Sequence, residues 1–133
     1  MQAKTMALFG EAEKGEFHKA YYCKTLDQLL ECFGHPPQES RGLDYAIQAL
    51  LYHCPLLFFR VREEGFSEQD YYDGIKLLKD QDSIPDIMAI CMPGVGSGEI
   101  INAVIPICAF YHSILVISES DFYDYLSSYK RNT

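Results

Sequence analysis

An alternation of apolar runs and helical segments in the second half of the chain constrains the fold most. Three apolar runs have the length and the β-branched or aromatic content of buried strands: Leu56–Val61, Ile87–Met92 and Ile114–Ile117. A segment that reads as a helix follows each of them, over Glu68–Lys79, Glu99–His112 and Glu119–Tyr129. Strands that are joined through helices pair in parallel, with right-handed crossovers.

Two further helices are predicted in the first half of the chain. Thr25 and Gln28 form a capping box, and Gly34 ends the helix that they begin. Apolar residues recur at helical spacing again over residues 42–53, which predicts a second helix that closes before Pro55.

Two short apolar stretches, Met6–Phe9 and Ala20–Cys23, predict additional strands. No internal repeat and no long linker divides the chain. We therefore predict that residues 1–133 form a single α/β domain. Its expected architecture is a small three-layer sandwich, with a mostly parallel sheet of about four to five strands flanked by helices.

Three local features of the predicted helices carry further expectations. The segment Glu99–His112 is apolar nearly all round, which is typical of a helix that is buried or packed on two sides. Pro106 lies within it and is expected to kink or interrupt the helix. Ser67 is expected to cap the helix that starts at Glu68.

The charge of the chain argues against polyanionic partners. It has 19 acidic and 11 basic residues and a formal net charge of −8. Because Lys and Arg must displace counterions from phosphates, we expect neither nucleic acid nor an anionic membrane as a partner. No apolar run approaches the roughly 20 residues that span a bilayer, and the first apolar stretch is too short for a signal-peptide core.

The cysteines indicate a reducing compartment. Their number is odd, none are spaced as Cys-x-x-Cys, and they lie among apolar neighbours: Cys23, Cys32, Cys54, Cys91 and Cys108. This usage favours reduced, buried thiols over a disulfide framework. We therefore expect a cytoplasmic protein.

The best candidate for a ligand site is a glycine-rich turn between a predicted strand and a predicted helix. It comprises Gly94, Val95, Gly96, Ser97 and Gly98. Backbone N–H groups and a helix dipole can hold an anion there, at the carboxyl end of a parallel strand. The run is neither G-x-G-x-x-G nor a P-loop, and Glu99 would repel a phosphate. A tight connection that needs the φ angles of glycine explains the same residues, so both interpretations stay open.

No catalytic set emerges around this turn. Cys91 and Ser97 are conceivable nucleophiles, but no base has defensible geometry and no G-x-S-x-G elbow surrounds Ser97. The histidines lie far apart without metal-ligand spacing: His18, His35, His53 and His112. The acids at the start of the last helix are interpreted as a solvated face: Glu119, Asp121 and Asp124. We therefore predict no catalytic residue, no metal site and no cofactor.

The aromatic content points to a protein interface. The chain has 10 tyrosines and 8 phenylalanines but no tryptophan. Three tyrosine pairs cannot all point inward: Tyr21 and Tyr22, Tyr71 and Tyr72, and Tyr123 and Tyr125. Exposed tyrosines favour interfaces, whereas tyrosines at the edge of a core keep only their hydroxyl in water. We predict an interface with a protein partner or a second copy at these residues, and the core-edge interpretation stays open.

The order of motifs along the chain is similar to that of a known family. The first motif is a strand with a Lys-Gly turn, Leu8–Gly15, and the second is a Thr-capped helix that ends in Phe-Gly, Thr25–Gly34. Next come a Tyr-Ala helix, Asp44–Ile47, and a strand that ends in Arg-Val, Phe58–Arg62. The last motif is a strand that ends in Pro-Gly, Ile90–Val95. This order, from Ala7 to Ser118, resembles the core of the contractile-tail sheath proteins of phages and related injection machines. Sheath proteins are much longer, with insertion domains and terminal arms that link subunits. The resemblance implies a minimal sheath-like module that binds a tail or secretion component without polymerising in the usual way.

We therefore expect a non-enzymatic structural or protein-interaction module, with a sheath-like component of a tail or secretion assembly as its specific form. The alternative is a small nucleotide- or anion-binding protein that uses the Gly94–Gly98 turn. An open turn that faces a pocket would favour this alternative, and a turn covered by side chains would disfavour it.

Overall fold

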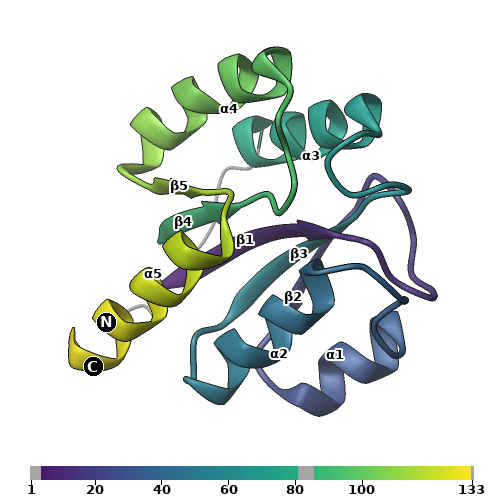
Figure 1. Cartoon of the computed structure of the whole chain (residues 1–133), viewed down its shortest axis with the longest axis vertical. Helices are drawn as coiled ribbons and strands as arrows, with labels where there is room; N and C mark the ends of the chain where they lie inside the picture. Colours follow the sequence, from purple (N-terminus) through teal and green to yellow (C-terminus); the bar gives the residue numbers. More distant parts are fainter. Residues whose placement is uncertain (1–3, 81–85, 133) are drawn as a thin grey trace.

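The computed structural model describes residues 4–80 and 86–132, and the side chains of these residues up to Ser128. Five strands and five helices form within this part of the chain (Figure 1). The strands are β1 (Thr5–Gly10), β2 (Ala20–Cys23), β3 (Leu56–Arg60), β4 (Ile87–Cys91) and β5 (Ile114–Val116). The helices are α1 (Leu26–Phe33), α2 (Gly42–Leu51), α3 (Glu68–Asp80), α4 (Gly98–Tyr111) and α5 (Glu119–Asn132).

The strands form one sheet in the order β2-β3-β1-β4-β5. Strands β3, β1, β4 and β5 pair in parallel, and β2 pairs antiparallel with β3. This arrangement confirms the mostly parallel α/β fold that the sequence predicts. In the sheet, β3 lies on one side of β1, and the next strand in the sequence, β4, lies on the other side of β1. The sheet therefore has a topological switch point between β1 and β4, and open α/β sheets bind ligands beyond the carboxyl ends of strands at such a point.

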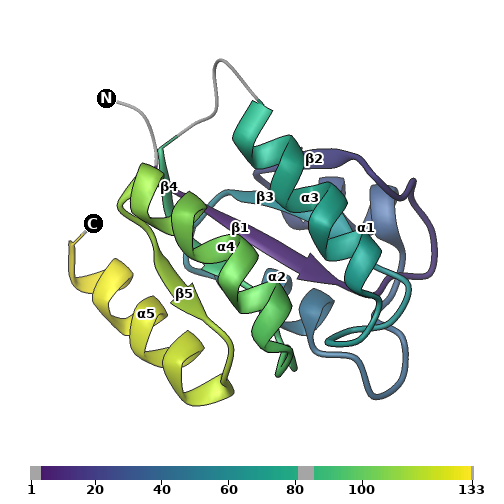
Figure 2. The same ribbon diagram turned by 90° about the horizontal axis from the view of Figure 1, so that it is seen from above.

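Helices cover both faces of the sheet. Helices α1, α2 and α5 pack on one face of the sheet (Figure 1). Helices α3 and α4 pack on the other face and lie in front of the sheet in Figure 2. Alternate residues of β1 supply the two cores, because successive side chains of a strand point to opposite faces. Met6 and Leu8 belong to the first core, Ala7 and Phe9 belong to the second, and all four are fully buried.

Aromatic rings fill the space between the sheet and its helices. On the first face, the ring of Phe33 in α1 lies 4.5 Å from that of Phe58 in β3. On the second face, Phe9 stacks on Phe59 at 4.6 Å and on Tyr71 of α3 at 5.4 Å. These separations are typical of favourable aromatic pairs, so the rings hold α1 and α3 against the sheet.

The signals predicted for α1 are present at both of its ends. The N–H of Gln28 donates to Oγ1 of Thr25 at 3.2 Å, and the N–H of Thr25 donates to Oε1 of Gln28 at 3.3 Å. Gly34 follows the helix with a φ of 76°, in the region that favours glycine. The capping box and the terminal glycine therefore set the limits of α1, as the sequence predicts.

Two local features of the helices differ from what the sequence predicts. Helix α4 is not interrupted at Pro106, since it runs from Gly98 to Tyr111 through this residue. Pro106 and Asn102 are both exposed, so the carbonyl that lacks an N–H partner lies on the solvent side, where water can satisfy it. Ser67 does not cap α3, because its hydroxyl accepts from the N–H of Glu63 and donates to the carbonyl of the same residue.

Candidate functional site

The glycine-rich turn lies at the switch point, directly after β4. Gly94 has a φ of 80°, and Gly94, Gly96 and Gly98 are exposed. A Cβ added at Gly96 or Gly98 would meet no atom within 4 Å. Val95 differs from these glycines, because its side chain is buried in the second core. The turn is therefore open rather than covered by side chains.

A shallow pocket of about 390 Å³ adjoins one end of this turn. The residues that line it come from the starts of α2 and α5 and from the loops after β4 and β5: Arg41, Tyr45, Gly94, Ile117, Ser118 and Glu119. Nη1 of Arg41 lies 2.9 Å from Oε2 of Glu119, and both side chains are more than half exposed. Of the five turn residues predicted as ligand contacts, only Gly94 lines this pocket.

The carboxylate of Glu64 ties together three segments beside the pocket. It accepts hydrogen bonds from the backbone N–H groups of Glu11 at 2.8 Å, Arg41 at 2.8 Å and Gly42 at 2.9 Å. In return, the N–H of Glu64 donates to Oε2 of Glu11 at 2.9 Å. Glu64 thereby satisfies the first N–H groups of α2 and fixes the backbone that carries Arg41.

Neither of the two nucleophile candidates near the turn, Ser97 and Cys91, is available for reaction. The hydroxyl of Ser97 caps α4 by accepting from the N–H of Ile100 at 3.4 Å. Cys91 is fully buried, and this burial raises the pKa of its thiol. A buried thiol that resists ionisation is a packing residue rather than a nucleophile.

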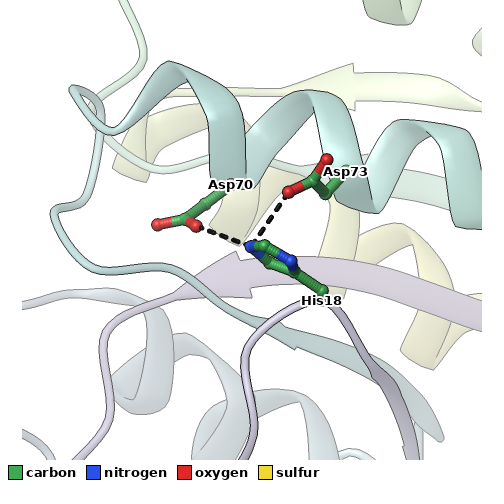
Figure 3. A group of neighbouring side chains, drawn as sticks. All are labelled: His18, Asp70 and Asp73. Carbon is green, nitrogen blue, oxygen red and sulfur yellow. Dashed lines mark ion pairs between the residues drawn. The ribbon is translucent and has the colours of Figure 1, made fainter.

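A second group of polar side chains lies where the segment between β1 and β2 meets α3 (Figure 3). Nε2 of His18 lies 2.9 Å from Oδ2 of Asp73 and 3.4 Å from Oδ1 of Asp70. The side chain of Asp70 is only 1% exposed, and it also pairs with the guanidinium of Arg62. His18 has a φ of 59°, and its imidazole points toward the two carboxylates on α3.

Sequence reasoning missed this group. The prediction of no metal site rests on the absence of His-x-x-x-His and Cys/His pairings from the sequence. The available signal was Asp70-x-x-Asp73, because residues three apart share one face of a helix. His18 joins the two carboxylates only through the fold, which brings the segment after β1 alongside α3.

The tyrosines predicted at an interface differ in their exposure. Tyr22 is 42% exposed and Tyr123 is 45% exposed, so both offer contact surface. The others are partly buried, at Tyr21, Tyr72 and Tyr125, or fully buried, at Tyr71. Tyr71 cannot contact a partner of the folded chain, because its ring lies in the core and its hydroxyl accepts from the N–H of Gly65.

The outer face of α4 consists of Ile105, Pro106, Ala109 and Phe110, and it is apolar. All four side chains are exposed, with Ile105 at 51% and Phe110 at 73%. The helix is therefore not buried as a whole, although it does pack on two sides, against the sheet and against α3. Helix α4 buries only its inner side, through Ile100, Val104, Ile107 and Cys108. The result is an apolar helix face that no described part of the chain covers.

Comparison with known proteins adds no relative. No protein-family model, no curated protein and no solved structure matches this chain. Among the described residues, no helix combines the length and the apolar character needed to cross a membrane.

Proposed function

We propose that this chain is a non-enzymatic protein-interaction module that associates through the outer face of α4. The observation that supports this proposal is the exposure of Ile105 and Phe110 on a helix that is apolar nearly all round. Helices of this composition are usually buried. Contiguous apolar surface on a monomer marks a site of interaction.

The occupant that we propose for this face is a second copy of the chain. Residues 100–111 contain no Asp, Glu, Lys or Arg, although the whole chain has a net charge of −8. Two copies can meet here without opposing carboxylates, whereas their like charges repel over the rest of the surface. A two-fold contact of α4 with α4 is self-complementary, and the small side chain of Ala109 allows close approach.

As the setting of this association we propose a tail or secretion assembly. The sheath-like order of motifs along the sequence supports that setting. In such an assembly the α4 face would contact a neighbouring subunit. The paired copy is the first association to test, because it needs only the chain itself.

Sedimentation equilibrium over a wide range of protein concentration tests the proposal. We expect reversible dimerisation of the wild type, and at least tenfold weaker dimerisation for Ile105→Glu and for Phe110→Glu. Leu51→Glu is the matched control, since Leu51 is 55% exposed on α2, which packs on the opposite face of the sheet. A wild type that stays monomeric at millimolar concentration, or a control that weakens the dimer equally, contradicts the proposal.

A second candidate function is the binding of a small anion or nucleotide at the glycine-rich turn. The openness of this turn at the switch point supports it. A thermal-shift panel of nucleotides and phosphates tests it, since ligand at 100 times its Kd stabilises by about 2.7 kcal/mol. Gly96→Val is a suitable variant, because open space surrounds its Cβ and the fold should tolerate it. Absence of a shift with every ligand removes this function.

A further inference from the structure

We propose that His18, Asp70 and Asp73 form a binding site for one divalent transition-metal ion, which goes beyond the proposed interaction function. The three donor atoms lie within 4.8 Å of one another. They come from two separate parts of the chain, since His18 precedes β2 and the two carboxylates belong to α3 (Figure 3). The set combines one imidazole nitrogen with two carboxylate oxygens, all of which are ligands for first-row metals.

Two of the three spacings between the donor atoms match those of ligands around a shared ion. Zinc and similar ions bind nitrogen and oxygen at about 2.0–2.2 Å, so neighbouring ligands of one ion lie about 2.9–3.5 Å apart. Nε2 of His18 lies 2.9 Å from Oδ2 of Asp73 and 3.4 Å from Oδ1 of Asp70. An ion can therefore take its place among these atoms with small side-chain movements.

Neighbouring groups already orient both carboxylates. Nε2 of Gln69 donates to Oδ1 of Asp73 at 2.9 Å, which leaves Oδ2 directed at the imidazole. The N–H of Arg62 donates to Oδ2 of Asp70 at 2.8 Å, which leaves Oδ1 facing His18. Hydrogen bonds of this kind to ligating carboxylates hold the ligands of metal sites in position.

The guanidinium of Arg62 contacts the same oxygen of Asp70 that faces His18. Its Nη1 also donates to Oδ1 of Asp70, and its plane lies over the ring of Phe17, with Cζ 4.2 Å from the ring centroid. Arg62 compensates one of the two negative charges and leaves the other for a cation. When the ion binds, the neutral imidazole supplies the lone pair of Nε2, so any proton on that nitrogen leaves to solvent.

The donor set and its exposure define the kind of ion. A single imidazole with two carboxylates suits Zn²⁺ and its neighbours better than Mg²⁺, which prefers oxygen ligands alone. The side chains of His18 and Asp73 are 49% and 25% exposed, so the remaining coordination positions face water. A bound ion would also join the segment before β2 to α3.

Isothermal titration of the full chain with Zn²⁺, with Mg²⁺ as the comparison, tests the site. We expect one Zn²⁺ per chain and at least tenfold weaker binding by His18→Ala and by Asp73→Asn. Asp70 is left unchanged, because its buried carboxylate also pairs with Arg62. Circular dichroism and the melting temperature of each variant show whether it is folded.

His35→Ala is the matched control, since His35 is an exposed histidine in the loop between α1 and α2. It should bind Zn²⁺ as the wild type does, and Zn²⁺ should raise the melting temperature of both. No binding of Zn²⁺ overturns the proposal. Binding that persists in folded His18→Ala and Asp73→Asn, or that is lost in His35→Ala, overturns it as well, because the ion then lies elsewhere.

Discussion

Burial in the core raises the pKa of several cysteine thiols in this protein. Burial raises the pKa of Cys23 and of Cys54 to about 12, from an ordinary value of 9.0. Burial also raises the pKa of Cys91 and that of the Tyr71 hydroxyl. These groups keep their protons in the folded chain at a pH where the unfolded chain has lost them.

We therefore expect the free energy of unfolding to fall as the pH rises above about 9. Thiols of the unfolded chain ionise near pH 9, whereas those of Cys23 and Cys54 stay neutral in the folded chain up to about pH 12. Each such thiol lowers stability by at most about 1.4 kcal/mol per pH unit in this window. Urea denaturation at pH 8, 9 and 10 measures the slope, which Cys23→Ala should reduce. An unchanged free energy of unfolding between pH 8 and pH 10 would contradict this expectation.

The sequence anticipates most of this burial. Four of the five cysteine side chains are buried, as the sequence predicts: Cys23, Cys54, Cys91 and Cys108. Cys32 is only partly buried, because it lies toward the edge of the α1 face that Leu29 and Phe33 bury. On a helix the face of the residue decides its burial, since Cys108 lies on the inner side of α4 and is buried.

At the scale of elements, the approach of α3 to the sheet depends on one glycine. Gly74 faces the ring of Phe9, and a Cβ at this position would overlap Cε2 and lie 2.9 Å from Cζ of that ring. Phe9 cannot move aside, because it is fully buried and stacks between Phe59 and Tyr71. A larger residue at Gly74 must therefore push α3 away from β1.

We expect Gly74→Ala to destabilise the fold by up to about 2 kcal/mol. Alanine gains about 1 kcal/mol in helix propensity over glycine, but overpacking of a rigid core costs about 1–3 kcal/mol and prevails here. Urea denaturation measures the difference. Gly96→Ala is the control, since its Cβ would lie in open space and its stability should stay close to that of the wild type. A stabilised Gly74→Ala variant would show that α3 adjusts freely.

Elements with clear periodicity could be predicted, and elements without it could not be placed. The capping box and apolar face of α1 predict both its limits and its inner side. Helix α4 has apolar residues on all sides, so its pattern cannot distinguish a covered side from an open one. Helix α4 lies near β5, a strand of three residues at the edge of the sheet. On this face of the sheet α4 packs beside α3, and this arrangement leaves the outer side of α4 exposed.

At the scale of the molecule, the alternation of strands and helices predicts a parallel sheet but not the order of its strands. Nothing in the run Met6–Phe9 indicates that β1 lies between β3 and β4. This central position creates the switch point and brings the loops after β1, β3 and β4 to one edge. The same placement brings His18 to Asp70 and Asp73, so the candidate metal site could not be found from spacing alone.

The side chain of Glu64 connects several segments at this edge of the sheet through hydrogen bonds. Its carboxylate accepts from the N–H groups of Glu11, Arg41 and Gly42, which belong to segments far apart in the sequence. A carboxylate at a helix N-terminus also interacts favourably with the helix dipole. Loss of this side chain would leave the start of α2 without its acceptor and release the backbone beneath Arg41.

We expect Glu64→Ala to lower the free energy of unfolding by about 2–4 kcal/mol. Hydrogen bonds to charged groups contribute about 1.5–3 kcal/mol each, and partial exposure of Glu64 reduces their sum. Glu63→Ala is the control, because Glu63 is exposed and contacts Ser67 only through its backbone. Hydrogen exchange should accelerate at the amides of Arg41 and Gly42 in Glu64→Ala alone. Equal stability of the two variants, with unchanged exchange at these amides, would show that α2 keeps its position without this carboxylate.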